Sequence, residues 1–147
     1  MIRRITTGST WEAKIGYARA VVAGGWVHVS GTTGTNHATG DIPDSVTDQC
    51  QLALEIIGAA LKQAGAGFEH AVRVTYVLKH AADFEACWPI LSATFGANPP
   101  AAMMIEAPLI DPRHLIEIEL TAFIAEQLPL ETVFGTEVPP AEVFLSV

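Results

Sequence analysis

Alternating apolar and polar residues predict a sheet with two helices along this chain. The stretch ARAVVAGGWVHVS at residues 18–30 is typical of two strands joined by a Gly-Gly turn, which is a hairpin signal. In its second arm Trp26, His28 and Ser30 share one face, and the valines between them share the other. A polar, glycine-rich loop follows. The same alternation predicts further strands at residues 2–6, 70–80, 101–107 and 114–125.

A spacing of three and four residues predicts the two helices. The first begins at Ser45, where Asp48 three residues on resembles a capping box, and it ends at Gly65, a natural left-handed cap. The second covers about residues 83–95, and Pro89 inside it predicts a kink or a late start. The order of elements is therefore βββαβαββ, an α+β arrangement in which both helices cover one face of a mixed sheet.

The last strand shows which face of the sheet the helices are expected to cover. Its apolar side consists of Ile116, Ile118, Leu120 and Ala122, and its mixed side of Leu115, Glu117, Glu119, Thr121 and Phe123. An open face with exposed leucine and phenylalanine would associate, so we expect another subunit to cover it. We also expect Glu106 to join Glu117 and Glu119 on this face.

Composition and charge narrow the class of protein. The chain has 147 residues, enough for one domain, and half of them are hydrophobic. No apolar run approaches the roughly 20 residues that cross a bilayer, and no signal-peptide core follows the first arginines, so we expect neither a membrane protein nor a secreted one. Cys50 and Cys87 fall inside predicted helices, which favours a reduced, cytoplasmic protein. A net charge of −8 argues against nucleic-acid binding.

Several local motifs occur in an order typical of one family. They are IGYARAV with Tyr17, VHVSGTTG with Ser30 and Gly31, ATGDIP before the first helix, ALEIIGAALKQAGAGFEHAVRVTYVLKHAADF, and NPPAAMMIEAPL followed by LIEIELTAFI. From about residue 3 to 125 the chain resembles the RidA family (YjgF, reactive intermediate deaminase), also called L-PSP endoribonuclease-like. The resemblance implies a chorismate-mutase-like fold and a homotrimer whose sheets form an inner barrel, with a cleft at each subunit interface. It also implies hydrolysis of enamines and imines to 2-keto acids and ammonia, without a cofactor.

The chain departs from the family at the residue that binds the substrate carboxylate. In the family an arginine clamps that carboxylate, and a glutamate fifteen residues on positions the water. Here the matching residues are Ala102 and Glu117. The asparagines that the family often carries in its helices appear as Ile56 and Trp88, and the proline before Tyr17 is absent. A bidentate arginine pair contributes roughly 1.5–3 kcal/mol, so the usual imino acids fit poorly and a ligand without a carboxylate fits better.

The candidate site residues each carry a structural alternative. Glu117 is the candidate catalytic residue, or else a structural carboxylate. The candidate substrate-binding residues are Tyr17, Ser30, Gly31, Ala102, Met104, Glu106 and Glu119. For Tyr17 the alternative is an interface aromatic, and for Glu106 and Glu119 it is an interface salt bridge or a solvated acid. Ser30 and Gly31 offer backbone N–H groups for an oxyanion, or simply start a turn.

Two arginines and the five histidines are the remaining charged or titratable residues considered for a binding role. Arg19 and Arg113 are the candidates to replace the missing arginine, and surface ion pairing is the favoured alternative for both. The five histidines lack metal-ligand spacing, so no metal is expected.

Two functions remain open from the sequence. One is an enzyme that hydrolyses or deaminates an enamine or imine other than the usual 2-imino acids; standard 2-iminobutanoate deaminase activity is doubtful. The other is a non-catalytic protein that binds a small ligand or regulates. Ribonuclease activity follows only from the family's second name, and the acidic charge opposes it. Residues 1–125 form the expected domain, and the apolar extension 126–147 is expected to pack on it or on a neighbouring subunit.

Overall fold

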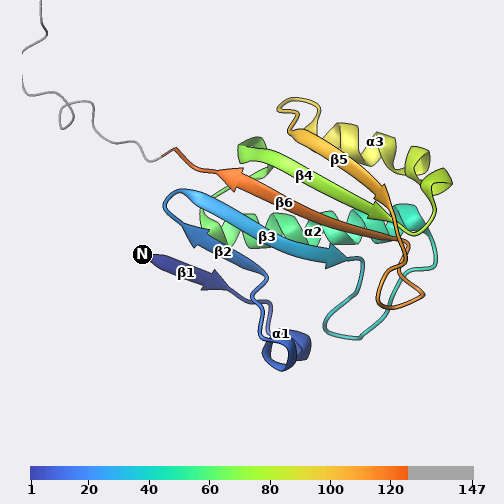
Figure 1. The fold of residues 1–147 in the computed structure, drawn as a ribbon, viewed down its shortest axis with the longest axis horizontal. Helices are drawn as coiled ribbons and strands as arrows, with labels where there is room; N and C mark the ends of the chain where they lie inside the picture. The colour runs from blue at the N-terminus through green and yellow to red at the C-terminus, as the bar shows by residue number, and fades with distance from the viewer. Residues whose placement is uncertain (126–147) are drawn as a thin grey trace, which may run out of the picture.

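A computed structural model describes residues 1–125 of the chain (Figure 1). Within this part six strands form one sheet in the order β1-β2-β3-β6-β4-β5. The strands are β1 (Ile2–Ile5), β2 (Ala20–Ala23), β3 (Trp26–Thr33), β4 (Ala71–Leu78), β5 (Ala101–Glu106) and β6 (Ile116–Phe123). The helices are α1 (Thr10–Ile15), α2 (Val46–Ala64) and α3 (Phe84–Phe95). Only β4 and β5 pair in parallel, so the expected mixed α+β sheet is confirmed. The predicted order lacked α1, which lies between β1 and β2.

The predicted hairpin joins β2 and β3 through Gly24 and Gly25. Both glycines have positive φ, 54° and 82°, as the tight turn of a two-residue hairpin requires. A side chain on Gly25 would also meet the carbonyl oxygen of Ile124 at 2.8 Å. The strand after the turn continues through Thr33, so residues 31–33, which we expected to open a loop, belong to β3.

Helices α2 and α3 begin and end much as the sequence predicts. The Asp48 amide donates to the Ser45 hydroxyl at 3.1 Å at the start of α2, and Gly65 ends it in the left-handed conformation. Helix α3 begins at Phe84, five residues before Pro89, so the late start is wrong. A short turn at residues 81–83 leads directly into α3, which buries Cys87, Leu91 and Phe95, and this burial favours the helix despite the proline.

One face of the sheet carries α2 and α3 and the other is open in the single chain (Figure 1). The helix-covered side of β6 is buried as expected: Ile116, Ile118, Leu120 and Ala122. On the open side, Trp26 of β3 and Phe123 of β6 are exposed and pack against each other, with ring centres 4.7 Å apart. Cover by another subunit stays a prediction.

Strand β5 corrects one sequence-based expectation. Ala102, Met104 and Glu106 pair with Val74, Tyr76 and Leu78 of β4, whose side chains are buried on the helix-covered side. Directly paired residues point to the same side of a sheet. Glu106 therefore lies on the helix-covered side, whereas Glu117 and Glu119 lie on the open side. The expectation that the three acids share one face is wrong, because the register of β5 had not been fixed.

Candidate functional site

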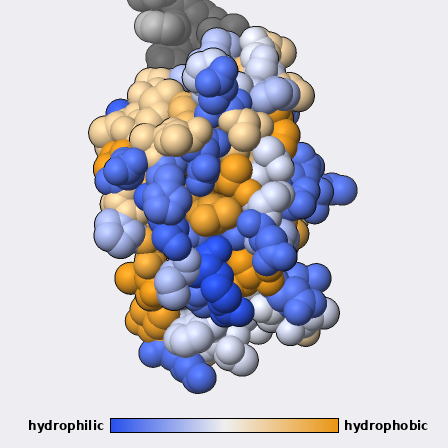
Figure 2. Space-filling model, turned by 90° about the vertical axis from the view of Figure 1, so that its right-hand side faces the viewer, coloured by the Kyte–Doolittle hydropathy of each residue, from blue (hydrophilic) through white to orange (hydrophobic). Residues whose placement is uncertain are grey.

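A cavity of about 610 Å³ lies at the end of the sheet where β3 ends and β6 begins. Its polar floor includes Ser30, Thr33 and Glu117 from the strands and Tyr17 from the segment between α1 and β2. Helix α1 and the loops at 34–45 and 107–115 provide the walls, which include the apolar residues Trp11, Ile15, Ile42 and Ile110. Figure 2 views the end of the molecule where these loops lie, and hydrophobic side chains are exposed there among hydrophilic ones. This volume lies within the usual range of pockets that bind small organic ligands.

Glu117 presents a carboxylate to this cavity. Within residues 1–125 no hydrogen bond reaches its side chain, so the carboxylate oxygens are available to a water molecule or a ligand. Burial raises the pKa of Glu117, Arg19 opposes that shift, and nearby Glu119 adds to it. A half-buried carboxylate with a raised pKa is a suitable proton acceptor near neutral pH.

Gly31 leaves space for the Glu117 carboxylate because it has no side chain. A Cβ atom at position 31 would collide with the Glu117 side chain, so only glycine fits there without a shift. The hydrogen-bond donors of the neighbouring Ser30 are both used within the fold. Its N–H donates to the Arg19 carbonyl at 3.0 Å, and its hydroxyl donates to the Ala18 carbonyl at 2.7 Å. An oxyanion-binding role for the Ser30 N–H is therefore wrong. Both residues nevertheless line the cavity, together with Tyr17 and Glu117.

Arg19 is buried at 3% exposure, so the expectation of a surface ion pair is wrong for this residue. Its Nη1 donates to the Gly31 carbonyl (2.9 Å) and the Thr32 hydroxyl (2.7 Å), and its Nη2 donates to the Tyr17 hydroxyl (3.1 Å). The Tyr17 oxygen thus accepts from Arg19, which leaves the Tyr17 O–H free to donate into the cavity. The Arg19 guanidinium therefore holds Tyr17, Gly31 and Thr32 in position, and most of its N–H groups already donate to these residues.

The negative partner of Arg19 is Glu12, whose Oε1 lies 3.8 Å from Arg19 Nε. Glu12 belongs to α1, is 5% exposed, and accepts hydrogen bonds from the backbone and hydroxyl of Thr7. Sequence reasoning missed both the helix and this residue. The signal was present in STWE, because Ser9 and Glu12 have the spacing of a capping box and Gly16 follows as a left-handed cap.

Arg113 forms the expected surface ion pair. It is 66% exposed, and its Nε and Nη2 donate to the two carboxylate oxygens of Asp111 at 3.1 and 2.7 Å. These bonds hold the pKa of Asp111 well below its usual range. Each arginine that lines the cavity is therefore paired with its own acid, Arg19 with Glu12 and Arg113 with Asp111.

Two histidines also line the cavity, and the sequence did not single them out. Burial lowers the pKa of both His37 and His114. The His114 Nε2 lies 2.8 Å from the Thr35 hydroxyl, which lies 3.3 Å from the Thr33 hydroxyl. Among residues 1–125, no group of three histidine, cysteine or acidic side chains is placed to hold a metal ion.

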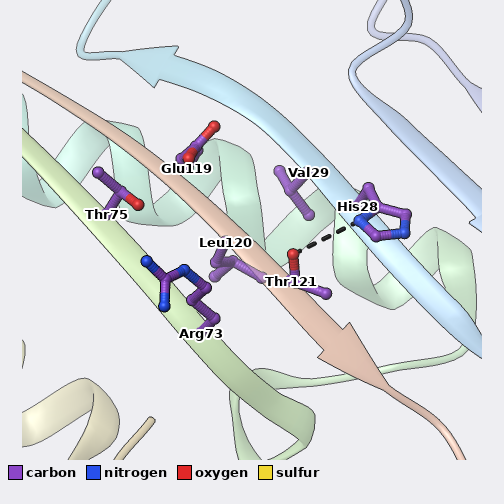
Figure 3. Close-up of a pocket in the computed structure, with 7 residues that line it drawn as sticks. All are labelled: His28, Val29, Arg73, Thr75, Glu119, Leu120 and Thr121. Atoms are coloured by element: carbon purple, nitrogen blue, oxygen red, sulfur yellow. Dashed lines mark hydrogen bonds between the residues drawn. The ribbon is translucent and has the colours of Figure 1, made fainter. Parts of the chain in front are cut away.

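Four of the candidate residues lie outside this cavity. Ala102, Met104 and Glu106 are exposed on β5, and the Glu106 carboxylate accepts from the backbone N–H of Ala81 at 2.6 Å. Glu119 lines a separate hollow of about 100 Å³ on the open face, with Arg73, Thr75 and His28 (Figure 3). A single chain thus brings together Tyr17, Ser30, Gly31 and Glu117, but not the others.

A mixed sheet with two helices on one face and a carboxylate-bearing cavity at the end of its open face defines the RidA/YjgF class of α+β proteins. Comparison with known proteins agrees with this assignment. Residues 7–124 match the family described as Endoribonuclease L-PSP, and the chain belongs to this family. No helix in residues 1–125 combines the length and hydrophobicity needed to span a bilayer.

Similar sequences and structures cover most of the chain. It is 32% identical to a goat protein named 2-iminobutanoate/2-iminopropanoate deaminase, over 90% of this chain and 96% of that protein. It is 30% identical to the human protein of the same name, with the same coverage. The crystal structure of Rv2704 from Mycobacterium tuberculosis, a member of the YjgF/YER057c/UK114 family, is 33% identical. It superposes with a TM-score of 0.77 over 84% of this chain and 100% of that one.

Proposed function

We propose that this protein hydrolyses the C=N bond of a small imine, or of the imine tautomer of an enamine, that carries no carboxylate. The goat and human relatives are named 2-iminobutanoate/2-iminopropanoate deaminase, and the cavity here offers a carboxylate at Glu117 and a hydroxyl donor at Tyr17. Glu117 positions the water and accepts its proton as the water oxygen attacks the carbon. The C=N electron pair moves to nitrogen, and the resulting carbinolamine breaks down to a carbonyl compound and ammonia.

The observation that carries this proposal is the balance of charge around the cavity. Arg19 and Arg113 are each paired with an acid, whereas the Glu117 carboxylate has no hydrogen-bond partner within residues 1–125. An anionic substrate would be repelled by the Glu117 carboxylate, and both guanidinium groups that line the cavity already have an acid beside them. A neutral imine or a cationic iminium would meet a complementary group.

Ala102 and Met104 belong to the same proposal through a second subunit. They lie on the exposed edge strand β5, where Met104 is 52% exposed, and the nearby Trp88 of α3 is 53% exposed. Phe84 connects these residues, since its ring packs against both Tyr76, the partner of Met104 in the sheet, and Trp88. In the homotrimer that we propose, this apolar strip of one copy faces the cavity of the next. It supplies a methyl group where the family's arginine would stand.

A non-catalytic ligand-binding protein is the second candidate. The replacement of the family's arginine with Ala102 favours this candidate, because a protein that catalyses no reaction does not need the residue that binds the substrate carboxylate. This candidate shares the cavity and the preference for ligands without a carboxylate, and it differs only in turnover.

Two substrates and two variants at position 102 separate these possibilities. The purified protein is mixed with benzophenone imine, a neutral ketimine, and in parallel with 2-iminobutanoate generated from threonine, and loss of the C=N absorbance is followed. We expect acceleration of the first reaction and little of the second. Ala102→Arg should reverse this order, because a guanidinium restores a partner for the carboxylate. Ala102→Lys is the matched control, since it adds the charge without the bidentate geometry. Binding without acceleration would favour the second candidate, and rapid loss of 2-iminobutanoate with the wild-type protein would contradict the proposed specificity.

A further inference from the structure

His114 is a titratable group in the cavity that the proposed reaction has not yet used. It lies in the loop before β6, where its backbone N–H donates to the Asp111 carbonyl at 3.0 Å. Its Nε2 lies 2.8 Å from the Thr35 hydroxyl in the opposite wall of the cavity. Thr35 in turn lies 3.3 Å from the Thr33 hydroxyl. The imidazole ring is therefore held by the Thr35 hydroxyl from the other side of the cavity, and Thr33 in turn contacts that hydroxyl.

The hydroxyl pair extends towards Glu117. Thr33 is directly opposite Glu117 in the pairing of β3 with β6, and such neighbours have Cβ atoms about 5 Å apart. Thr33, Thr35 and His114 thus form a continuous polar row that begins beside the Glu117 carboxylate. Because Thr35 occupies Nε2, the nitrogen left for a ligand is Nδ1, which has no hydrogen bond to residues 1–125. In the tautomer whose Nε2–H donates to the Thr35 hydroxyl, Nδ1 carries the free lone pair and can accept a proton.

The surroundings of His114 favour its neutral form. Burial has the largest effect and lowers its pKa; Asp111 raises it and Arg113 lowers it. The other titratable groups that line the cavity are Tyr17, Arg19, His37 and Glu117. A neutral imidazole is a base, and at neutral pH it is ready to accept a proton.

We propose that His114 is a second catalytic base, which accepts the hydroxyl proton of the carbinolamine when this intermediate collapses. This inference rests on the proposed function. Water first adds to the iminium R₂C=NH₂⁺, and its proton passes to Glu117, giving R₂C(OH)NH₂. Glu117 returns that proton to nitrogen, forming R₂C(OH)NH₃⁺. The C–N bond then breaks with its electron pair on nitrogen, ammonia leaves, and the O–H proton passes to Nδ1 of His114. The products are R₂C=O, NH₃ and the imidazolium, which releases its proton to solvent.

The test compares pH–rate profiles of kcat for benzophenone imine between pH 5 and 9. His114→Gln places an amide near the Nε2 position, so Thr35 keeps a partner but the base is lost. We expect kcat to fall by about 100-fold and the pH profile to lose the part of its acid-side decrease that protonation of His114 causes, leaving only the decrease that protonation of Glu117 causes. His37→Gln removes the other cavity histidine as a matched control and should keep the whole acid-side decrease. Thr35→Val should lower kcat, and Thr35→Ser, which keeps the hydroxyl, should restore it.

Each outcome decides the inference. A His114→Gln protein with kcat within threefold of wild type overturns it, and so does a lower kcat with an unchanged pH profile, which would indicate a structural role. Imidazole ¹H–¹⁵N spectra provide a readout independent of turnover: His114 should occupy one tautomer in the wild type and in Thr35→Ser, and a mixture in Thr35→Val. A wild-type protein that accelerates no imine hydrolysis would remove the proposed function itself, and this inference with it. Activity that His114→Gln retains would remove the inference alone.

Discussion

Glu117 and Glu119 are two residues apart on β6 and point to the same face of the sheet, yet their surroundings differ. Glu117 lies in a cavity of about 610 Å³, whereas Glu119 is exposed beside a hollow of about 100 Å³ (Figure 3). The strand gives both the same orientation. The difference comes from α1 and from the two loops, which surround the end of the sheet at Glu117 and do not reach Glu119. The chemistry of a carboxylate on this sheet is thus set by segments outside it.

Replacement of each acid by glutamine is the most direct test of this comparison. Glu117→Gln keeps the shape of the side chain and removes the proton acceptor, so kcat for benzophenone imine should fall by about 100-fold or more. Glu119→Gln removes the same charge from the same strand and should change kcat by less than about threefold. Steady-state rates at pH 7.5 measure both. Equal losses in the two variants would mean that charge on the open face, rather than the position of Glu117, supports the reaction.

The pattern along the chain predicts the sheet better than it predicts the cavity. Alternation and helical spacing identify all six strands and both long helices, and β3, β6, α2 and α3 each bury a regular apolar side. The cavity walls have no such period: α1 has only six residues, the loop at 34–45 is mostly polar, and the apolar residues of the loop at 107–115 follow neither helix nor strand spacing. Their positions depend on single contacts between residues far apart in the chain, such as His114 with Thr35, which no local pattern contains.

The candidate site residues also differ in how far the sequence alone places them. Tyr17, Ser30, Gly31 and Glu117 follow from the family resemblance, and one cavity brings them together. Ala102 follows from the same resemblance and Met104 from its alternation with Ala102, but they lie on the far edge of the sheet, and only a second subunit would bring them to a cavity. The face of Glu106 depends on the register of β5 against β4, which alternation alone cannot fix. The predicted packing of residues 126–147 lies outside the described residues.

Gln49 holds the two loops that distinguish the surroundings of Glu117 from those of Glu119. It is fully buried on α2, and its Nε2 donates to the carbonyls of Pro43 (2.7 Å) and Arg113 (3.0 Å). Its Oε1 accepts from the Leu115 N–H at 2.8 Å. One side chain therefore connects the loops at 34–45 and 107–115.

Gln49→Leu would leave these three backbone groups without their partner in a buried place. We expect the free energy of unfolding to fall by about 2 kcal/mol, measured by urea titration. Gln51→Leu, on the exposed side of the same helix, is the matched control and should change stability by less than about 0.5 kcal/mol. If both variants have equal stability, the loops do not depend on Gln49, and the enclosure of Glu117 has another cause.

The smallest expected effect concerns stability and pH at Glu117. Burial raises the pKa of this carboxyl, so the folded chain holds its proton more tightly than the unfolded chain does. The contribution of Glu117 to stability therefore falls as pH rises above about 4.5 and through the folded-state pKa. Glutamine carries no such proton, so the stability gained by Glu117→Gln should be larger at pH 7 than at pH 4, by less than about 1 kcal/mol because solvent screens this half-buried carboxylate. Urea titrations at the two pH values measure this difference, and Glu119→Gln controls for the loss of one negative charge from an acidic chain. If the gain does not grow with pH, or if it only equals that of Glu119→Gln, burial does not distinguish the two acids, and the cavity does not set the proton affinity on which catalysis by Glu117 depends.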